Sequence, residues 1–223
     1  MTDWKFIFEK WLLRRHRHPP YEPAVKRIMR RIKGGCFLDV GANVGVYSLG
    51  FHKNFREVHA FEPNVWVREE LLKKAARKAV SNLKVWPYAL SDTNGFATLF
   101  LDPHIGFAGT SDTILQEFNY DPASQPQFAH AYKGEKGVNV ETRTIDSLDI
   151  LRPFTLLKID VEGAEFRVLE GAKETLKQKN VEHLIVELHD RNRREELVGL
   201  LGSYGYSVKW VDADHLYSKL SEI

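Results

Sequence analysis

A glycine-rich turn after a short apolar run is the first feature of this chain that could do chemistry. Residues 37–45 read Phe-Leu-Asp-Val-Gly-Ala-Asn-Val-Gly, so a buried strand runs through Asp39 into Gly41, Asn43 and Gly45 at the start of a helix. Glycine lets the backbone turn sharply and lets a ligand approach without a Cβ atom in the way. We therefore expect a nucleoside ligand at the end of this strand.

The residues between the glycines indicate which nucleoside. A pyrophosphate pressed against a helix N-terminus favours glycine at positions 41, 43 and 46, but this chain has Asn43 and Val46. S-adenosylmethionine (SAM) carries no phosphate and tolerates side chains there, so the turn favours SAM over a dinucleotide. Glu62 ends the next apolar run, where an acid can accept both ribose hydroxyls of either nucleoside. A solvated glutamate at a strand end is the alternative for Glu62.

Polar residues also follow the later apolar runs. Ligands of open α/β sheets lie across the carboxyl ends of the strands, so Ala89 and Asp92, in the turn after the third run, are expected beside the adenine. A simple turn-forming Ser-Asp pair is the alternative for Asp92. Asp160 ends the fourth run and is expected beside the sulfonium and its methyl group. Glu162 follows Asp160 and could instead complement a helix dipole.

The elements that must position these residues alternate along the chain. The apolar runs predict strands at 36–40, 57–61, 83–86, 155–159 and 183–187, and the stretches 206–211 and 215–217 could add an antiparallel pair. Between them lie helical patterns, among them one capped by Asn64 that should bury Leu71, Leu72, Ala75 and Ala79. The alternation predicts an α/β fold with a mostly parallel, seven-stranded sheet and helices on both faces.

The charge distribution divides the chain at about residue 33. Residues 1–33 carry ten Lys/Arg against three Asp/Glu, a net of +7, whereas residues 34–223 carry 22 against 27, a net of −5. We predict a basic, helical N-terminal extension at 1–33 and a ligand-binding domain at 34–223. Within that domain, about 93–154 form an insertion with two extended pieces, 96–101 and 138–144, which we place on the substrate side.

Composition narrows the class of protein further. The acidic body argues against a domain that grips nucleic acid over a whole face. A single cysteine, Cys36, excludes an intramolecular disulfide, and no apolar run approaches the roughly 20 residues of a membrane-spanning helix. A cytoplasmic location is therefore expected.

Taken together, these blocks resemble the FkbM family of SAM-dependent methyltransferases. The resemblance covers about residues 36–190 and is carried by the segments 37–45, 61–63, 89–95, 144–148, 158–165, 171–172 and 185–187. It implies a Rossmann-like class I methyltransferase domain, SAM contacts at Gly41, Asn43 and Glu62, and an active-site place for Asp160. It also implies an acceptor that is a hydroxyl of a glycan, a lipid or a small natural product. Residues 1–33 and much of 100–137 lie outside it, and acceptor choice is expected there.

A hydroxyl acceptor must lose its proton as its oxygen attacks the methyl group. We expect Asp160 or His189, at the end of the fifth strand, to take that proton, with Glu162 orienting the base. These three residues would also suit a divalent metal ion, which stays an alternative to a metal-free site.

Other functions share the same motifs. A methyltransferase-like module could bind the nucleoside without turnover. RNA methylation would use the basic residues of 14–17 and 26–33 against phosphates, although no basic groove studded with aromatic residues is evident. The first helix, with Trp4, Phe8 and Trp11 beside a basic flank, could contact a membrane surface or simply pack on the domain.

Overall fold

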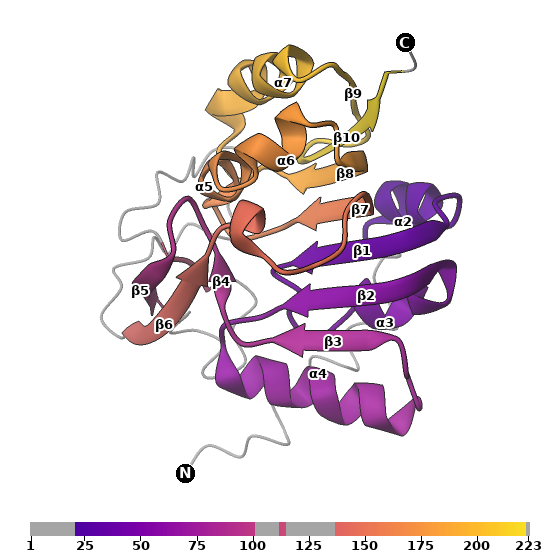
Figure 1. Cartoon of the computed structure of the whole chain (residues 1–223), viewed down its shortest axis with the longest axis vertical. Coiled ribbons are helices and arrows are strands. Elements are labelled where there is room, and N and C mark those ends of the chain that lie inside the picture. Colours follow the sequence, from indigo (N-terminus) through magenta and orange to yellow (C-terminus); the bar gives the residue numbers. More distant parts are fainter. Residues whose placement is uncertain (1–20, 101–111, 115–136, 222–223) are drawn as a thin grey trace.

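A seven-stranded sheet forms the centre of the computed structural model, which describes residues 21–100, 112–114 and 137–221. Its strand order is β3-β2-β1-β7-β8-β10-β9 (Figure 1). The strands are β1 (Gly34–Val40), β2 (Phe55–Phe61), β3 (Leu83–Trp86), β7 (Phe154–Ile159), β8 (Val181–Glu187), β9 (Tyr206–Trp210) and β10 (His215–Leu220). All pairings are parallel except those of β10, which is antiparallel to both β8 and β9. The predicted sheet is confirmed, with β10 inserted between β8 and β9.

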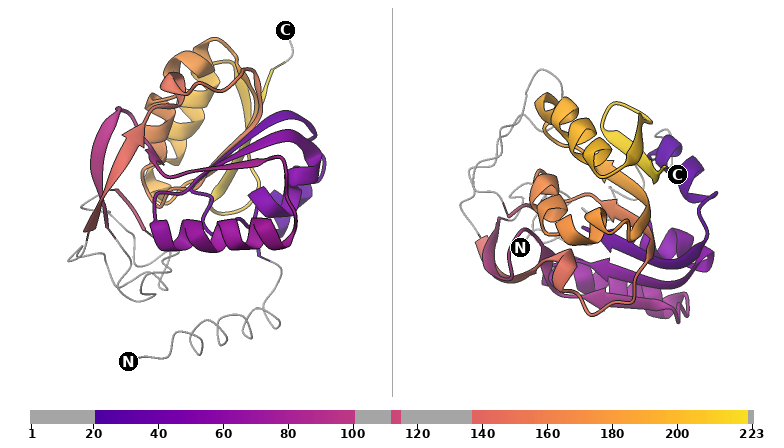
Figure 2. Two further views of the ribbon diagram at one scale, coloured as in Figure 1. Left: turned by 60° about the horizontal axis from the view of Figure 1, so that its bottom comes forward. Right: turned by 45° about the horizontal axis from the view of Figure 1, so that its top comes forward.

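Helices pack on both faces of this sheet (Figure 2). One face carries α2 (Pro23–Met29), α3 (Ser48–Phe51) and α4 (Val65–Arg77), and the other carries α5 (Glu165–Glu170), α6 (Lys173–Lys177) and α7 (Arg194–Ser203). Successive residues of β1 point to opposite faces, so Phe37 packs with Met29 of α2 while Leu38 belongs to the cluster that contains Leu176 of α6. Short 3-10 turns lie at His52–Asn54, Ile145–Ser147 and Arg191–Arg193.

Helix α4 ends earlier than its apolar pattern predicts. Asn64 does cap α4, because its Oδ1 accepts from the backbone N–H groups of Trp66 and Val67 at 3.0 and 3.4 Å. Leu72 is exposed, however, and Ala79 lies beyond the helix in a left-handed conformation (φ 51°). The prediction that these two residues are buried is therefore wrong. An αL residue after the last turn ends a helix, and the apolar pattern does not record it.

The predicted insertion supplies two strands of a second, three-stranded sheet, and the third comes just before the insertion. The strands of this sheet are β4 (Ala89–Leu90), β5 (Gly95–Phe100) and β6 (Gly137–Arg143), in the order β4-β6-β5. β5 and β6 are antiparallel, as two extended pieces joined by a long loop permit. This sheet lies beyond the ends at which β1, β2, β3 and β7 point (Figure 1). From the loop itself the structure describes residues 112–114, of which Thr113 pairs with Phe100.

The predicted first helix and its basic flank, residues 1–20, lie outside the described residues. Among the residues that are described, no helix combines the length and the apolar character needed to cross a membrane.

Candidate active site

The loop after β1 is shaped by close contact with the end of β7. Gly41 has a left-handed backbone (φ 76°), and a Cβ atom there would lie 1.7 Å from the carbonyl oxygen of Asp160. The backbone of Asp160 in turn donates to the carbonyl of Val40 at 3.1 Å. Only glycine fits this position, so the glycine-rich turn brings the ends of β1 and β7 together.

Asp39 stabilises this loop through hydrogen bonds to Ser48. Its carboxylate is buried and accepts from the backbone N–H of Ser48 at 2.9 Å and from the hydroxyl of the same residue. Burial raises the pKa of Asp39, and the ammonium of Lys158 opposes that rise. Gly45 lies in the same loop with φ 80° and packs against Leu71. Asp39 and Gly45 therefore fix the shape of the segment that carries Asn43.

Glu62 and Asn43, predicted to share the cofactor, are joined directly. The Oε2 of Glu62 accepts from the backbone N–H of Asn43 at 2.9 Å, and its Oε1 accepts from the backbone N–H of Asn64 at 2.9 Å. Burial raises the pKa of Glu62 to about 7, although these two N–H groups favour the ionised form. The end of β2 thus presents a buried acid against the loop after β1.

Part of the insertion reaches this acid. The side-chain amide of Asn64 donates to Asp112 at 2.6 Å, and the charge of Asp112 is one of the causes that raise the pKa of Glu62. Asp92, by contrast, is exposed and accepts from the Ser91 hydroxyl at 2.9 Å, and Ala89 packs within the small sheet. Among the residues predicted to line the cofactor, the contacts above join Asn43 and Glu62, while Asp92 and Ala89 lie within the second sheet and its turn.

A buried lysine accompanies Asp160. The Nζ of Lys158 lies 2.9 Å from the Oδ2 of Asp160 and 4.6 Å from the centre of the Tyr47 ring. Burial alone would raise the pKa of Asp160, but the ammonium of Lys158 and the imidazole of His189 outweigh it and hold that pKa below its usual value. Asp160 is therefore ionised at neutral pH.

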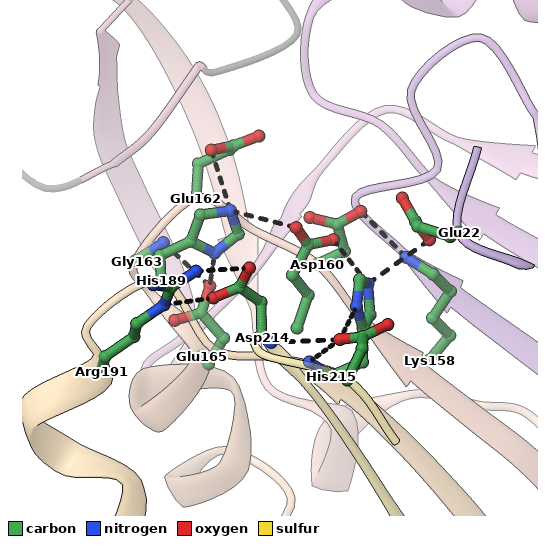
Figure 3. A network of polar contacts seen from close by, with 12 residues as sticks. Glu22, Lys158, Asp160, Glu162, Gly163, Glu165, His189, Arg191, Asp214 and His215 are labelled. Carbon is green, nitrogen blue, oxygen red and sulfur yellow. Dashed lines mark hydrogen bonds and ion pairs between the residues drawn. The ribbon is translucent and has the colours of Figure 1, made fainter. Parts of the chain in front are cut away.

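His189 lies between two glutamates (Figure 3). Its Nδ1 is 2.9 Å from Glu165, and its Nε2 is 3.0 Å from Glu162. Burial alone would lower the pKa of His189, but the charges of Glu162 and Glu165 outweigh it and raise that pKa well above 6.5. Both ring nitrogens donate, so the side chain is an imidazolium in this arrangement.

Glu162 is the outer member of this group. Its side chain is 22% exposed, against 1% for Glu165, and its backbone is left-handed (φ 54°). Burial raises its pKa to about 7, and the nearby imidazole opposes the rise. The three predicted catalytic residues thus come together, with ligand atoms of Asp160, Glu162 and His189 all within 4.8 Å of one another. That donor set would also accept a divalent ion, so the metal alternative stays open.

The sequence reasoning missed a second polar group beside the first. His215 of β10 lies 3.1 Å from Glu187 at the end of β8, and Glu187 lies 3.9 Å from His189. Glu22, just before α2, accepts from the hydroxyl of Tyr47 and lies 3.4 Å from His215. A buried charge needs a partner, so the lysine within the apolar run 154–159 was a signal for this network. Glu22 has no such signal.

The chain is similar to known methyltransferases along most of its length. The family model described as "Methyltransferase FkbM domain" matches residues 39–221. The 31-O-demethyl-FK506 methyltransferase FkbM of Streptomyces tacrolimicus is 28% identical over 200 residues, which cover 78% of this chain and 74% of that protein.

Solved structures share the fold. The crystal structure of methyltransferase FkbM from Methylobacillus flagellatus has a TM-score of 0.55 and 17% identity, covering 84% of this chain but only 43% of that chain. A Streptococcus mutans protein in complex with SAH, the demethylated product of SAM, has a TM-score of 0.51 and 10% identity, covering 91% and 99%. The family match contains the glycine turn and the strand-end acids described above, so this chain belongs to the FkbM methyltransferase family.

Proposed function

We propose that this protein transfers the methyl group of SAM to a hydroxyl group on a glycan, a lipid or a small natural product. Membership of the FkbM family supports methyl transfer. The relative from Streptomyces tacrolimicus supports an oxygen acceptor, because its name describes a substrate that lacks an O-methyl group. The single observation that carries the proposal is Glu62, held by two backbone N–H groups against the loop after β1.

The residues at the strand ends fit SAM. A carboxylate has about four acceptor sites, and the backbone uses two of those on Glu62, so both oxygens can still accept from ribose hydroxyls. The side chain of Asn43 would crowd a pyrophosphate, and the carboxylates of Glu62 and Asp112 would repel one. The same carboxylates favour a cationic sulfonium, so the local charge supports SAM over a dinucleotide.

In this proposal the acceptor proton goes to Glu162, in place of Asp160 or His189, which the sequence led us to expect as the base. Bound SAM would supply an electrophilic methyl group, and alignment of the acceptor would lower much of the barrier. A general base works best when its pKa is near the working pH, which fits Glu162 with its pKa near 7. His189, protonated between two glutamates, orients Glu162, and Asp160 stays ionised beside Lys158.

The insertion at about 93–154 is the proposed acceptor side. Its small sheet lies at the carboxyl ends of the central strands (Figure 1), and Asp112 reaches the residue that caps α4. Of the proposed basic extension at 1–33, the described residues 21–33 pack on the domain at 34–223 through α2, and acceptor choice is proposed for the parts outside the motifs.

Two measurements test the proposal. Calorimetric titration with SAM should give saturable binding, and NADH should give none. Transfer of tritium from labelled SAM is then screened across sugars, glycolipids, small phenols and tRNA, with SAH release as the second readout. Label on a hydroxyl compound is the expected result. Binding without SAH release from any acceptor would indicate a non-catalytic module, and label confined to tRNA would indicate RNA methylation.

A further inference from the structure

A second histidine–carboxylate cluster lies beside the candidate active site and outside the proposed reaction. It consists of Glu22, Glu187 and His215, whose ligand atoms all lie within 4.8 Å of one another. The three residues come from the segment before α2, the end of β8 and the start of β10, and Figure 3 labels two of them, Glu22 and His215. Glu22 lies before residues 39–221, the region that the family model matches. One of the three residues of the cluster therefore comes from a part of this chain that the family model does not cover.

The distances around His215 match those between ligands of one metal ion. Its Nε2 lies 3.1 Å from the Oε2 of Glu187 and 3.4 Å from the Oε2 of Glu22. One N–H can make a good hydrogen bond to only one of these oxygens, and 3.4 Å is long for such a bond. Nitrogen and oxygen ligands about 2.1 Å from a shared ion lie about 3.0 Å apart at an octahedral angle and about 3.4 Å apart at a tetrahedral one.

The orientation of the imidazole is fixed from the other side. The Nδ1 of His215 lies 2.8 Å from the Oδ1 of Asp212, and that oxygen also accepts from the backbone N–H groups of Asp214 and His215 at 3.0 and 2.8 Å. A carboxylate on the far nitrogen, itself held by other donors, is the usual outer partner of a metal-binding histidine. It directs Nε2 at the two glutamates.

Glu22 is held where an unstrained glutamate would not lie. Its backbone is left-handed (φ 45°, ψ 62°), a conformation that costs free energy in a residue other than glycine. The hydroxyl of Tyr47 donates to the same Oε2 that faces His215. Glu187 and Glu22 both bring negative charge toward the single ammonium of Lys158, which already pairs with Asp160.

We propose that Glu22, Glu187 and His215 bind one divalent transition-metal ion, with Mn²⁺ and Zn²⁺ as the ions to test. A donor set of one imidazole and two carboxylates suits such ions. The ion would join three parts of the fold, the segment before α2, β8 and β10. Its ligand Glu187 also lies 3.9 Å from His189 of the candidate active site.

The other histidine clusters of the described residues are accounted for by hydrogen bonds. The Nδ1 of His59 accepts from the indole N–H of Trp86 at 3.0 Å, so its Nε2 carries the proton and donates to Glu57. The Nε2 of His189 lies 3.0 Å from Glu162 and 3.9 Å from Glu187, and its Nδ1 lies 2.9 Å from Glu165. His59 therefore serves as a matched control, and His189 tests whether the ion lies in the active-site group instead.

The test is metal titration of the chelator-treated full chain by calorimetry, with Mn²⁺ binding followed also by electron paramagnetic resonance. One ion per chain is expected, with release of the proton that the metal-free imidazole holds on Nε2. Glu22→Gln and His215→Gln should each weaken binding roughly tenfold or more, and Asp212→Asn, which keeps all three ligands, should weaken it about 10- to 100-fold. His59→Gln should bind as the wild type does.

Three results would overturn the proposal. The first is no saturable binding of either ion by the wild-type protein. The second is unchanged affinity in Glu22→Gln, His215→Gln and Asp212→Asn. The third is loss of the ion in His189→Gln with retention in His215→Gln, which would place the ion in the active-site group. Circular dichroism checks that each variant is folded, and Asp212→Asn decides the matter if a ligand variant unfolds. None of these readouts depends on methyl transfer.

Discussion

Glu162 shows how one residue can carry several signs of function at once. Its backbone is left-handed, its side chain is partly exposed, and a buried imidazolium fixes its position at 3.0 Å. Strained backbones of this kind persist where the surrounding structure over-determines them, and they cluster at active sites. Glu165 supports the arrangement because it accepts from both His189 and the backbone N–H of Gly163. These contacts support the proposed role of Glu162 as the group that takes the proton of the acceptor.

Substitution of this glutamate should remove the base without removing the cofactor site. We expect Glu162→Gln to lower kcat about 10²- to 10⁴-fold, the usual contribution of a general base, with SAM affinity nearly unchanged. Wild-type kcat should rise with pH through about 7, because the pKa of Glu162 is near that value and only the ionised form accepts a proton. The variant should lose this rise. A pH profile that is the same in both proteins would remove Glu162 from this role and return it to Asp160 or His189.

Glu62 is expected to control cofactor binding. In Glu62→Gln an amide N–H₂ group faces one of the backbone N–H groups of Asn43 and Asn64, and the charged acceptor for the ribose is lost. Hydrogen bonds to charged groups contribute about 1.5–3 kcal/mol, so SAM affinity should fall roughly 10- to 100-fold in calorimetry. Affinity for the wild type should also fall as the pH drops below about 7, because protonation of Glu62 removes the charge. The control is Glu70→Gln, which alters a surface pair with Lys73 on α4; equal loss in both variants would argue against the ribose contact.

The strand-end residues could be predicted because parallel strands bring their carboxyl ends to one edge of the sheet. Sequence position alone therefore placed Glu62, Asp160 and His189 near one another. His215 and Glu22 could not be placed in this way. His215 begins a strand that runs in the opposite direction, so its amino end, not its carboxyl end, reaches that edge. Glu22 arrives there through the packing of α2 on the sheet, which no local pattern encodes.

At the scale of elements, the junction between β1 and β7 is the tightest backbone contact of the candidate site. Gly41→Ala would place a Cβ atom against the carbonyl oxygen of Asp160 and would put alanine in a left-handed conformation. We expect a loss of more than about 2 kcal/mol in the free energy of unfolding, together with loss of SAM binding. Urea denaturation measures the first effect and calorimetry the second.

A second glycine of the same region provides the control. A Cβ atom at Gly50, on α3, would meet nothing within 4 Å. Gly50→Ala should therefore stabilise the protein by about 0.5–1 kcal/mol, because alanine restricts the unfolded chain and favours the helix. If Gly41→Ala and Gly50→Ala destabilise the protein equally, the loss is not specific to the contact between Gly41 and Asp160.

The strands were easier to predict than the helices for a physical reason. A strand buried on both faces is a continuous apolar run, and each of the five parallel strands was found within two residues of its observed bounds. Helix ends depend on single backbone conformations. Helix α2 stops at Met29, before the two glycines that begin β1, and a break at Gly171 and Ala172 separates α5 from α6. Apolar periodicity continues through such breaks.

At the scale of the whole molecule, Lys158 connects distant parts of the chain. Its ammonium lies among the charges of Asp160, Asp39, Glu187 and Glu22, which come from β7, β1, β8 and the segment before α2. Burial opposes its charge, but these carboxylates outweigh burial and hold its pKa above the usual value. One cation thereby stabilises acids from the central strands and from the N-terminal side of the domain.

Removal of this cation should destabilise the entire fold. Lys158→Met leaves buried carboxylates without a partner, which costs roughly 3–5 kcal/mol. The loss should be larger at pH 7.5 than at about pH 3, which lies below the usual pKa of 3.8 for an aspartate such as Asp160. In the wild type the lowered pKa of Asp160 adds stability above the unfolded-state pKa, and that stability is lost as the pH falls. Urea denaturation at both pH values measures the difference. Lys177→Met, which removes an exposed pair with Glu174, should change stability by less than about 1 kcal/mol at either pH, and a comparable loss there would contradict this account.

The place of β10 has a consequence for synthesis of the protein. β10 follows β9 along the chain but lies between β9 and β8 in the sheet. During translation, β9 therefore emerges before it has any strand to pair with, and β8 keeps an open edge until β10 is made. Open edges of apolar strands invite pairing with other chains. Ribosome stalling or proteolysis before residue 215 should thus leave an aggregation-prone fragment that also lacks His215, and pulse-labelled nascent chains would show this as loss of solubility relieved once β10 is added.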